Sequence, residues 1–165
     1  MSGAINPLRR ILLYIDGSES SIVAAQFAIA IAKIYSCELK ALYVVNEDLL
    51  NELLRAKVFV QVEKMDYERD LEEDGKRYLN YIEKLANSKG LEIEKSLRKG
   101  VVHEEVAKEV EEWGCDVLIQ GELGEVLSLR DSFYEEGERI LRKVSCPVMV
   151  VRGSSKIQAI FDSLK

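Results

Sequence analysis

The sequence predicts an α/β fold, a five-stranded parallel sheet with helices on both faces. Short apolar runs alternate along the chain with longer segments in which apolar residues recur at helical spacing. The apolar runs end in Gly, Asp or Asn, residues that favour turns. Because strands and helices alternate, right-handed crossovers would make neighbouring strands parallel.

Composition indicates one folded, soluble unit. The chain has 165 residues, of which 47% are hydrophobic and 32% charged, so it is long and apolar enough to bury a core. We therefore interpret residues 1–165 as a single domain, with 153–165 as a C-terminal extension. The net charge of −6 argues against general binding to nucleic acid or to anionic lipid.

No apolar stretch is long enough to span a membrane. The longest, residues 22–34, is interrupted by Gln26 and Lys33. The three cysteines lie far apart and form no C-x-x-C pair, so we interpret them as reduced, mostly buried thiols. Because no signal peptide opens the chain, the expected location is the cytoplasm.

The first strand is predicted over residues 10–15, a short apolar run. It ends in a turn at Asp16-Gly17-Ser18. Ser18 or Ser20 is the expected N-cap of the helix that follows, in which apolar residues recur at helical spacing up to residue 34.

The second strand is predicted over residues 39–45. The next stretch, 48–62, favours a short helix followed by a mobile connection. A long amphipathic helix then runs up to Gly90, a natural helix stop. The third strand is predicted over 91–97, where apolar and polar residues alternate, and it is expected to turn at Lys99-Gly100.

The second half of the chain continues the alternation. The predicted elements are a helix over 102–113, a strand over 116–120, a helix over 133–144 and a strand over 147–151. The tail, 153–165, is expected to be a short amphipathic segment that packs back on the domain or on a partner.

Candidate ligand-binding residues follow the predicted strands. An open parallel sheet binds ligands beyond the carboxyl ends of its strands, where the strand order reverses. The candidates are Asp16, Gly17, Val45, Gly100, Gly121 and Gly124. Asp16 either accepts a hydrogen bond from a base or sugar or serves only as a turn and cap residue. Gly121 and Gly124 form a G-x-x-G whose backbone N–H groups suit a phosphate, but such a pair is common.

Several motifs resemble the universal stress protein family between residues 9 and 152. The opening strand is similar to the family's first strand, which typically runs into Asp-Gly-Ser, as here at Asp16-Gly17-Ser18. Residues 42–45 resemble its second strand, and Gly100 sits at the family's third-strand turn. The closing half of the family is matched by 116–121, 139–142 and, most specifically, 146–151.

The resemblance implies a Rossmann-like fold of the adenine-nucleotide α-hydrolase type, in which Asp16 would contact adenine. ATP-binding members carry G-x2-G-x9-G-(S/T), whose glycines wrap the phosphates while the hydroxyl donates to them. Gly121 and Gly124 match the first half of this motif, but Tyr134-Glu135 stands where Gly-Ser/Thr is expected. A bulky ring and a negative charge both oppose a polyphosphate. We therefore expect no required cofactor, with ATP or another adenine compound as the alternative.

The function that the resemblance implies is a regulatory or stress-response domain that is not an enzyme. Family dimers commonly form by antiparallel pairing of the last strands, here 147–151, so we expect a homodimer and an unidentified protein partner. The alternative is an ATP-binding switch or slow ATPase that uses Asp16, Gly121 and Gly124.

Other classes find less support in the sequence. An adenylating enzyme needs a loop after the first strand that is richer in glycine, and a receiver domain needs an acidic cluster and a strand-end lysine that we cannot place. The only histidine, His103, has no His or Cys at ligand spacing. We therefore expect neither a metal site nor a hydrolase triad.

Overall fold

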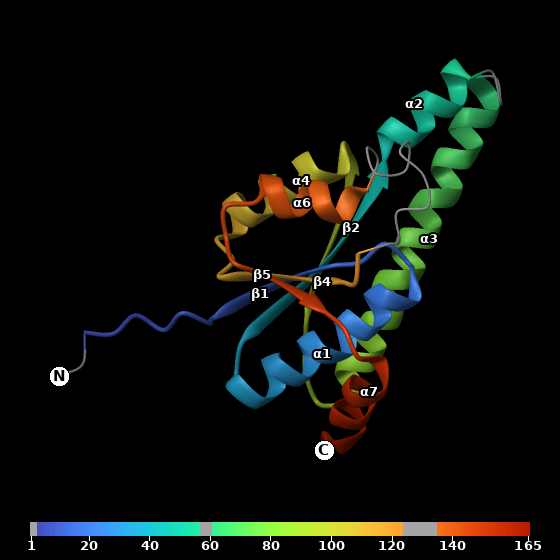
Figure 1. Ribbon diagram of the computed structural model, residues 1–165. Helices are drawn as coiled ribbons and strands as arrows, with labels where there is room; N and C mark the ends of the chain where they lie inside the picture. Colours follow the sequence, from blue (N-terminus) through green and yellow to red (C-terminus); the bar gives the residue numbers. More distant parts are fainter. Residues whose placement is uncertain (1–2, 57–60, 124–134) are drawn as a thin grey trace.

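The computed structural model describes residues 3–56, 61–123 and 135–165 (Figure 1). Within them, one sheet contains β1 Arg10–Tyr14, β2 Glu38–Asn46, β3 Glu94–Gly100, β4 Val117–Gly121 and β5 Val148–Val151. Every pair of neighbouring strands is parallel, and the order is β3-β2-β1-β4-β5. The predicted five-stranded parallel sheet is thus confirmed.

Helices cover both faces of the sheet, as predicted (Figure 1). One face carries α1 (Glu19–Tyr35), α3 (Gln61–Ser88) and α7 (Ser154–Ser163). The other carries α4 (Val102–Trp113) and α6 (Glu136–Lys143). The remaining described helix, α2 (Glu47–Arg55), follows β2 directly and extends beyond the sheet beside α3 (Figure 1).

The middle strand, β1, is buried from both sides. Successive side chains of a strand point to opposite faces. Ile11 and Leu13 therefore enter the core beneath α1, α3 and α7, while Leu12 and Tyr14 enter the core beneath α4 and α6. A strand covered on both faces is apolar at nearly every position. The bounds of β1 can therefore be predicted from the sequence.

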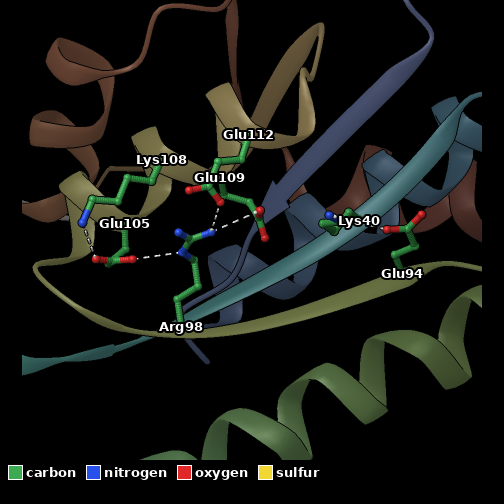
Figure 2. Close-up of polar contacts among 7 residues, drawn as sticks. All are labelled: Lys40, Glu94, Arg98, Glu105, Lys108, Glu109 and Glu112. Carbon is green, nitrogen blue, oxygen red and sulfur yellow. Dashed lines mark hydrogen bonds and ion pairs between the residues drawn. The ribbon is translucent and has the colours of Figure 1, made fainter.

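The predicted bounds of the third strand are wrong. The sequence pattern favours 91–97 with a turn at Lys99-Gly100, whereas β3 pairs with β2 from Glu94 through Gly100. Polar residues continue this strand, and one of them, Arg98, is bound by α4. The guanidinium of Arg98 lies 2.9, 3.3 and 3.1 Å from carboxylate oxygens of Glu105, Glu109 and Glu112, respectively (Figure 2). Apolar alternation cannot reveal a strand that is held by ion pairs.

Two other predicted segments agree with the structure where it describes them. The stretch 48–62 does contain a short helix, α2, and residues 57–60 after it lie outside the described residues. The helix predicted over 133–144 occurs as α6, although Phe133 also lies outside them. None of the described helices is long and apolar enough to cross a membrane.

The tail packs back on the domain, one of the two outcomes expected for it. Its helix α7 lies against α1, and Ile157 and Phe161 are buried in the core shared by α1 and α3. The ammonium of Lys89 lies 4.8 Å from the centre of the Phe161 ring and donates to the Leu164 carbonyl at 3.2 Å. The tail is therefore part of the packed structure.

Phe161→Ala should lower the free energy of unfolding by about 3 kcal/mol, because it leaves a cavity where a buried ring packed. Urea unfolding followed by circular dichroism measures the change. Lys156→Ala is the matched control, since Lys156 is an exposed residue of the same helix, and it should change stability little. A Phe161→Ala loss as small as that of the control would contradict the packing described.

Candidate functional site at the strand switch point

A cavity of about 230 Å³ opens beyond the carboxyl ends of β1 and β4. The chain leaves β1 toward β2 and leaves β4 toward β5, in opposite directions along the sheet. Such a reversal of strand order is where open parallel sheets bind ligands. Three segments line the cavity: the turn after β1 with the start of α1, the end of β4, and the start of α6.

The structure brings together only part of the predicted site. Asp16 and Gly121 line the cavity. Gly17, Val45 and Gly100 do not line it, and Gly124 lies outside the described residues.

The three candidates away from the cavity have structural roles in the fold. Val45 is only 1% exposed and belongs to the core beneath α1. Gly100 is paired with Asn46 at the end of β3. Gly17 has a φ of +86°, and a Cβ placed there would lie 2.5 Å from the ring of Tyr78. Glycine is needed at position 17 because the backbone is left-handed and α3 packs directly on this turn.

Asp16 has the geometry of a turn and cap residue. Its Oδ1 accepts hydrogen bonds from the backbone N–H of Ser18 at 2.9 Å and from the Ser18 hydroxyl at 2.5 Å. Ser18 in turn caps α1, because its Oγ accepts from the N–H of Ser21 at 3.2 Å. The turn therefore fixes the Asp16 carboxylate at the rim of the cavity, whether or not a ligand uses it.

Gly121 allows two backbones to approach closely. A Cβ at this position would lie 2.6 Å from the carbonyl carbon and oxygen of Ser20, in the first turn of α1. These atoms belong to the main chain and cannot rotate away as a side chain could. Gly121 is therefore required for packing as well as being a candidate to contact a ligand.

Glu135 is the N-cap of α6. Its carboxylate accepts a hydrogen bond from the backbone N–H of Gly137 at 3.2 Å. The N-terminus of a helix has unpaired N–H groups and a partial positive charge, which together attract anions. Here the protein's own side chain takes up that position, a role that the sequence did not reveal. Tyr134, the other residue that departs from the family motif, lies outside the described residues.

Negative charge predominates in the cavity. Its described lining contains the carboxylates of Asp16, Glu122, Glu135 and Glu136 and no basic side chain. The pKa of Tyr14, which also lines the cavity, lies well above its usual value, first because the phenol is buried and then because the charges of Asp16 and Glu136 oppose a phenolate. Tyr14 is therefore a neutral hydroxyl at physiological pH.

Basic groups outside the cavity partly balance these charges. Glu136 lies 3.3 Å from Nδ1 of His103 and 3.2 Å from the guanidinium of Arg139. Glu122 lies 3.8 Å from the guanidinium of Arg152, and both of these side chains are more than half exposed. The exposed Glu122–Arg152 pair contributes little, whereas the half-buried Arg139 compensates part of the charge of Glu136, so the negative charge of the cavity is reduced but not cancelled.

Gln120 and Glu136 line the cavity but were not among the predicted site residues. Gln120 is 2% exposed, and its Nε2 donates to the Gly137 carbonyl at 3.2 Å. Its Oε1 is buried and has no hydrogen-bond partner among the described residues. The one signal in the sequence is a polar residue at the end of an otherwise apolar strand, directly before Gly121. In the described part of the chain, no group of three or more His, Cys, Asp or Glu side chains is arranged to hold a metal ion.

Comparisons with known proteins agree with the resemblance seen in the sequence. The model of the universal stress protein family matches residues 7–152. Universal stress protein MJ0531 of Methanocaldococcus jannaschii is 28% identical over 151 residues, covering 92% of this chain and 86% of that protein.

Solved structures show the same fold. MJ0577 from the same organism gives a TM-score of 0.68 at 22% identity, covering 90% of this chain and 98% of that one. A universal stress protein family protein from Arabidopsis thaliana, solved with AMP bound, gives a TM-score of 0.61 at 15% identity, covering 90% of this chain and 94% of that one. Because the family model spans most of its length, this chain belongs to the universal stress protein family.

Proposed function

We propose that this protein is a non-catalytic regulatory member of its family that has lost the usual grip on the phosphates of ATP. The observation that carries the proposal is the hydrogen bond from the Gly137 N–H to the Glu135 carboxylate. The motif that the family resemblance implies for ATP binding has Ser or Thr at the position of Glu135. Here a carboxylate takes the place next to the helix N-terminus that a phosphate would need.

Electrostatics adds to this obstruction. A phosphate that displaced Glu135 from the helix would still lie in a cavity lined by Asp16, Glu122 and Glu136. Unit charges ~4 Å apart repel by about 1 kcal/mol in water and by about 4 kcal/mol at an effective dielectric constant near 20. A triphosphate brings several charges, so this repulsion acts against whatever its hydrogen bonds to backbone N–H groups supply.

An adenine compound without a triphosphate meets less opposition. The Arabidopsis relative was solved with AMP bound, and the cavity here keeps polar groups that suit a nucleoside. Asp16 accepts hydrogen bonds, the neutral Tyr14 hydroxyl both donates and accepts, and Gln120 has a buried oxygen without a partner in the described chain. We therefore place a nucleoside or a nucleotide with few phosphates ahead of ATP as a ligand.

An ATP-binding switch or slow ATPase is the second candidate. It is favoured by Gly121, the described glycine of the family's ATP motif, which lines the cavity. It requires that Mg²⁺ or a movement of Glu135 overcome the repulsion. Affinity for ATP separates the two candidates.

The double variant Tyr134→Gly with Glu135→Ser restores the family motif and should gain affinity for Mg-ATP. We expect a gain of at least about tenfold over the wild type, the equivalent of relieving about 1.4 kcal/mol of repulsion. Equilibrium dialysis of labelled ATP against each purified protein measures it.

Glu138→Ser is the control for this experiment. It removes the same charge from α6, but Glu138 is paired with Arg142 at 2.7 Å and does not line the cavity. It should leave ATP affinity unchanged. Equal affinities of the wild type and the restored variant would count against the role given to Glu135.

The protein is further proposed to form a homodimer through β5. This strand is an edge of the sheet and exposes apolar side chains, with Met149 38% exposed. The opposite edge, β3, carries charged side chains such as Lys95, which is bound to Glu83 at 3.0 Å. Charges discourage pairing of an edge strand with another chain, whereas an apolar edge favours it. A two-fold axis would pair β5 with its own copy.

Met149→Lys should convert this dimer to a monomer at micromolar concentration, because two lysines would be buried near the axis without partners. Light scattering coupled to size-exclusion chromatography measures the mass. Tyr35→Lys is the control: Tyr35 is 65% exposed at the end of α1 and is not part of β5, so its substitution should leave the dimer intact. A wild-type monomer, or a Met149→Lys dimer, would contradict the proposed interface.

A further inference from the structure

Two of the cysteines lie next to each other at the end of the sheet opposite the cavity. Cys115 precedes β4 and Cys146 precedes β5, and their sulfur atoms are 3.8 Å apart. Both thiols are half-buried and pack against the core beneath α4 and α6. The third cysteine, Cys37, is 6% exposed in the core of the other face. The sheet therefore separates the pair from the remaining thiol.

Strand pairing supports a geometry suited to a disulfide. Leu118 is paired with Val148, and the N–H of Leu118 donates to the Pro147 carbonyl at 2.9 Å. Continued back by two positions, this register sets Cys146 opposite Asp116, one residue from Cys115. With strand spacing of about 4.8 Å and a rise of about 3.3 Å per residue, the Cα atoms of the two cysteines would be about 5.8 Å apart. Disulfides span about 4.4–6.8 Å between Cα atoms.

We propose that Cys115 and Cys146 form a reversible intramolecular disulfide when the protein meets a peroxide. One sulfur attacks the O–O bond, becomes a sulfenic acid and releases water, and the second sulfur then displaces the hydroxyl, which leaves as a second water. Two thiols thereby lose two hydrogens and two electrons, which hydrogen peroxide takes up to give two waters. A small dithiol reverses the step by exchange.

The environment of the pair favours closure of the disulfide over further oxidation. A sulfenic acid on either cysteine has the other sulfur in contact with it, so the intramolecular step needs only a small side-chain rotation. Burial, together with the neighbouring Cys146 and Asp116, raises the pKa of Cys115 to about 12. Cys115 is therefore a thiol at neutral pH, and oxidation should be slow there and faster in alkaline solution.

The disulfide would close a loop of the chain that holds half of the site. Cys115 and Cys146 are 31 positions apart, and between them lie β4, Gly121, Glu135 and α6. A cross-link of this length restricts the unfolded chain. The oxidised protein should accordingly be more stable, and its edge strand β5 more firmly held beside β4.

The experiment treats the full-length protein with excess hydrogen peroxide, blocks free thiols with an alkylating agent, and measures intact mass and peptide masses. The wild type and Cys37→Ser should each lose two hydrogens and yield one peptide pair joining Cys115 to Cys146. Cys115→Ser and Cys146→Ser should yield no such pair. Dithiothreitol should restore all thiols, and Tm of the oxidised wild type should exceed that of the reduced form by about 5 to 10 °C.

Three results would overturn the inference. The first is a wild type that keeps every thiol free or forms only sulfinic acid under peroxide. The second is a bond to Cys37 or between two molecules. The third is an oxidised form whose Tm is equal to or below that of the reduced protein, because the sulfurs would then meet only by distorting the fold. Circular dichroism spectra of the serine variants show whether they fold like the wild type.

Discussion

β1 is buried from both sides, and this constraint positions both halves of the candidate site. Its apolar side chains alternate between two cores, so helices must cover each face. β4 lies directly beside β1, and the chain leaves these strands in opposite directions. Asp16 and Gly121 consequently meet although more than a hundred residues separate them. At the same place Gly121 passes so close to the backbone of Ser20 that no side chain fits between these two segments of the cavity lining.

The residue that caps α6 affects which ligands a cavity of this fold can bind. A helix that begins at a strand switch point directs its unpaired N–H groups and partial positive charge into the cavity. A hydroxyl residue at the cap leaves room for a phosphate, whereas the carboxylate of Glu135 binds the Gly137 N–H itself. Glu122 and Glu136 also line the cavity with negative charge, and the charges of Asp16 and Glu136 add to burial in raising the pKa of Tyr14. In the function proposed above, the residue at this cap decides whether a phosphate can bind there.

Parts of this fold and site could be predicted from the sequence and other parts could not, for a physical reason. Strands buried on both faces, such as β1, are continuous apolar runs and are easily identified. β3 lies at the edge and is held by the ion pairs of Arg98 with α4, so its bounds follow no apolar pattern. Asp16 and Gly121 could be predicted because turn-forming residues directly after an apolar run are recognisable from the local sequence.

Tertiary contacts and side-chain directions account for what the sequence did not reveal. Two of these features join segments that only the folded chain brings together: the packing of Tyr78 on Gly17 and the contact of Cys115 with Cys146. The other two depend on where a side chain points: the N-cap role of Glu135 and the burial of Gln120. The effect of Tyr134 and Gly124 on the cavity stays a prediction, because both residues lie outside the described ranges.

Calorimetric titration of the wild-type protein with Mg-ATP tests directly whether this cavity has lost its grip on the phosphates of ATP. The protein must first be freed of any nucleotide that co-purifies with it, and its folding confirmed by circular dichroism. We expect no binding heat up to millimolar ATP, because Glu135 holds the N-terminus of α6 and the cavity is negatively charged. Micromolar or tighter binding would contradict it and would show that this cavity holds a triphosphate by another route.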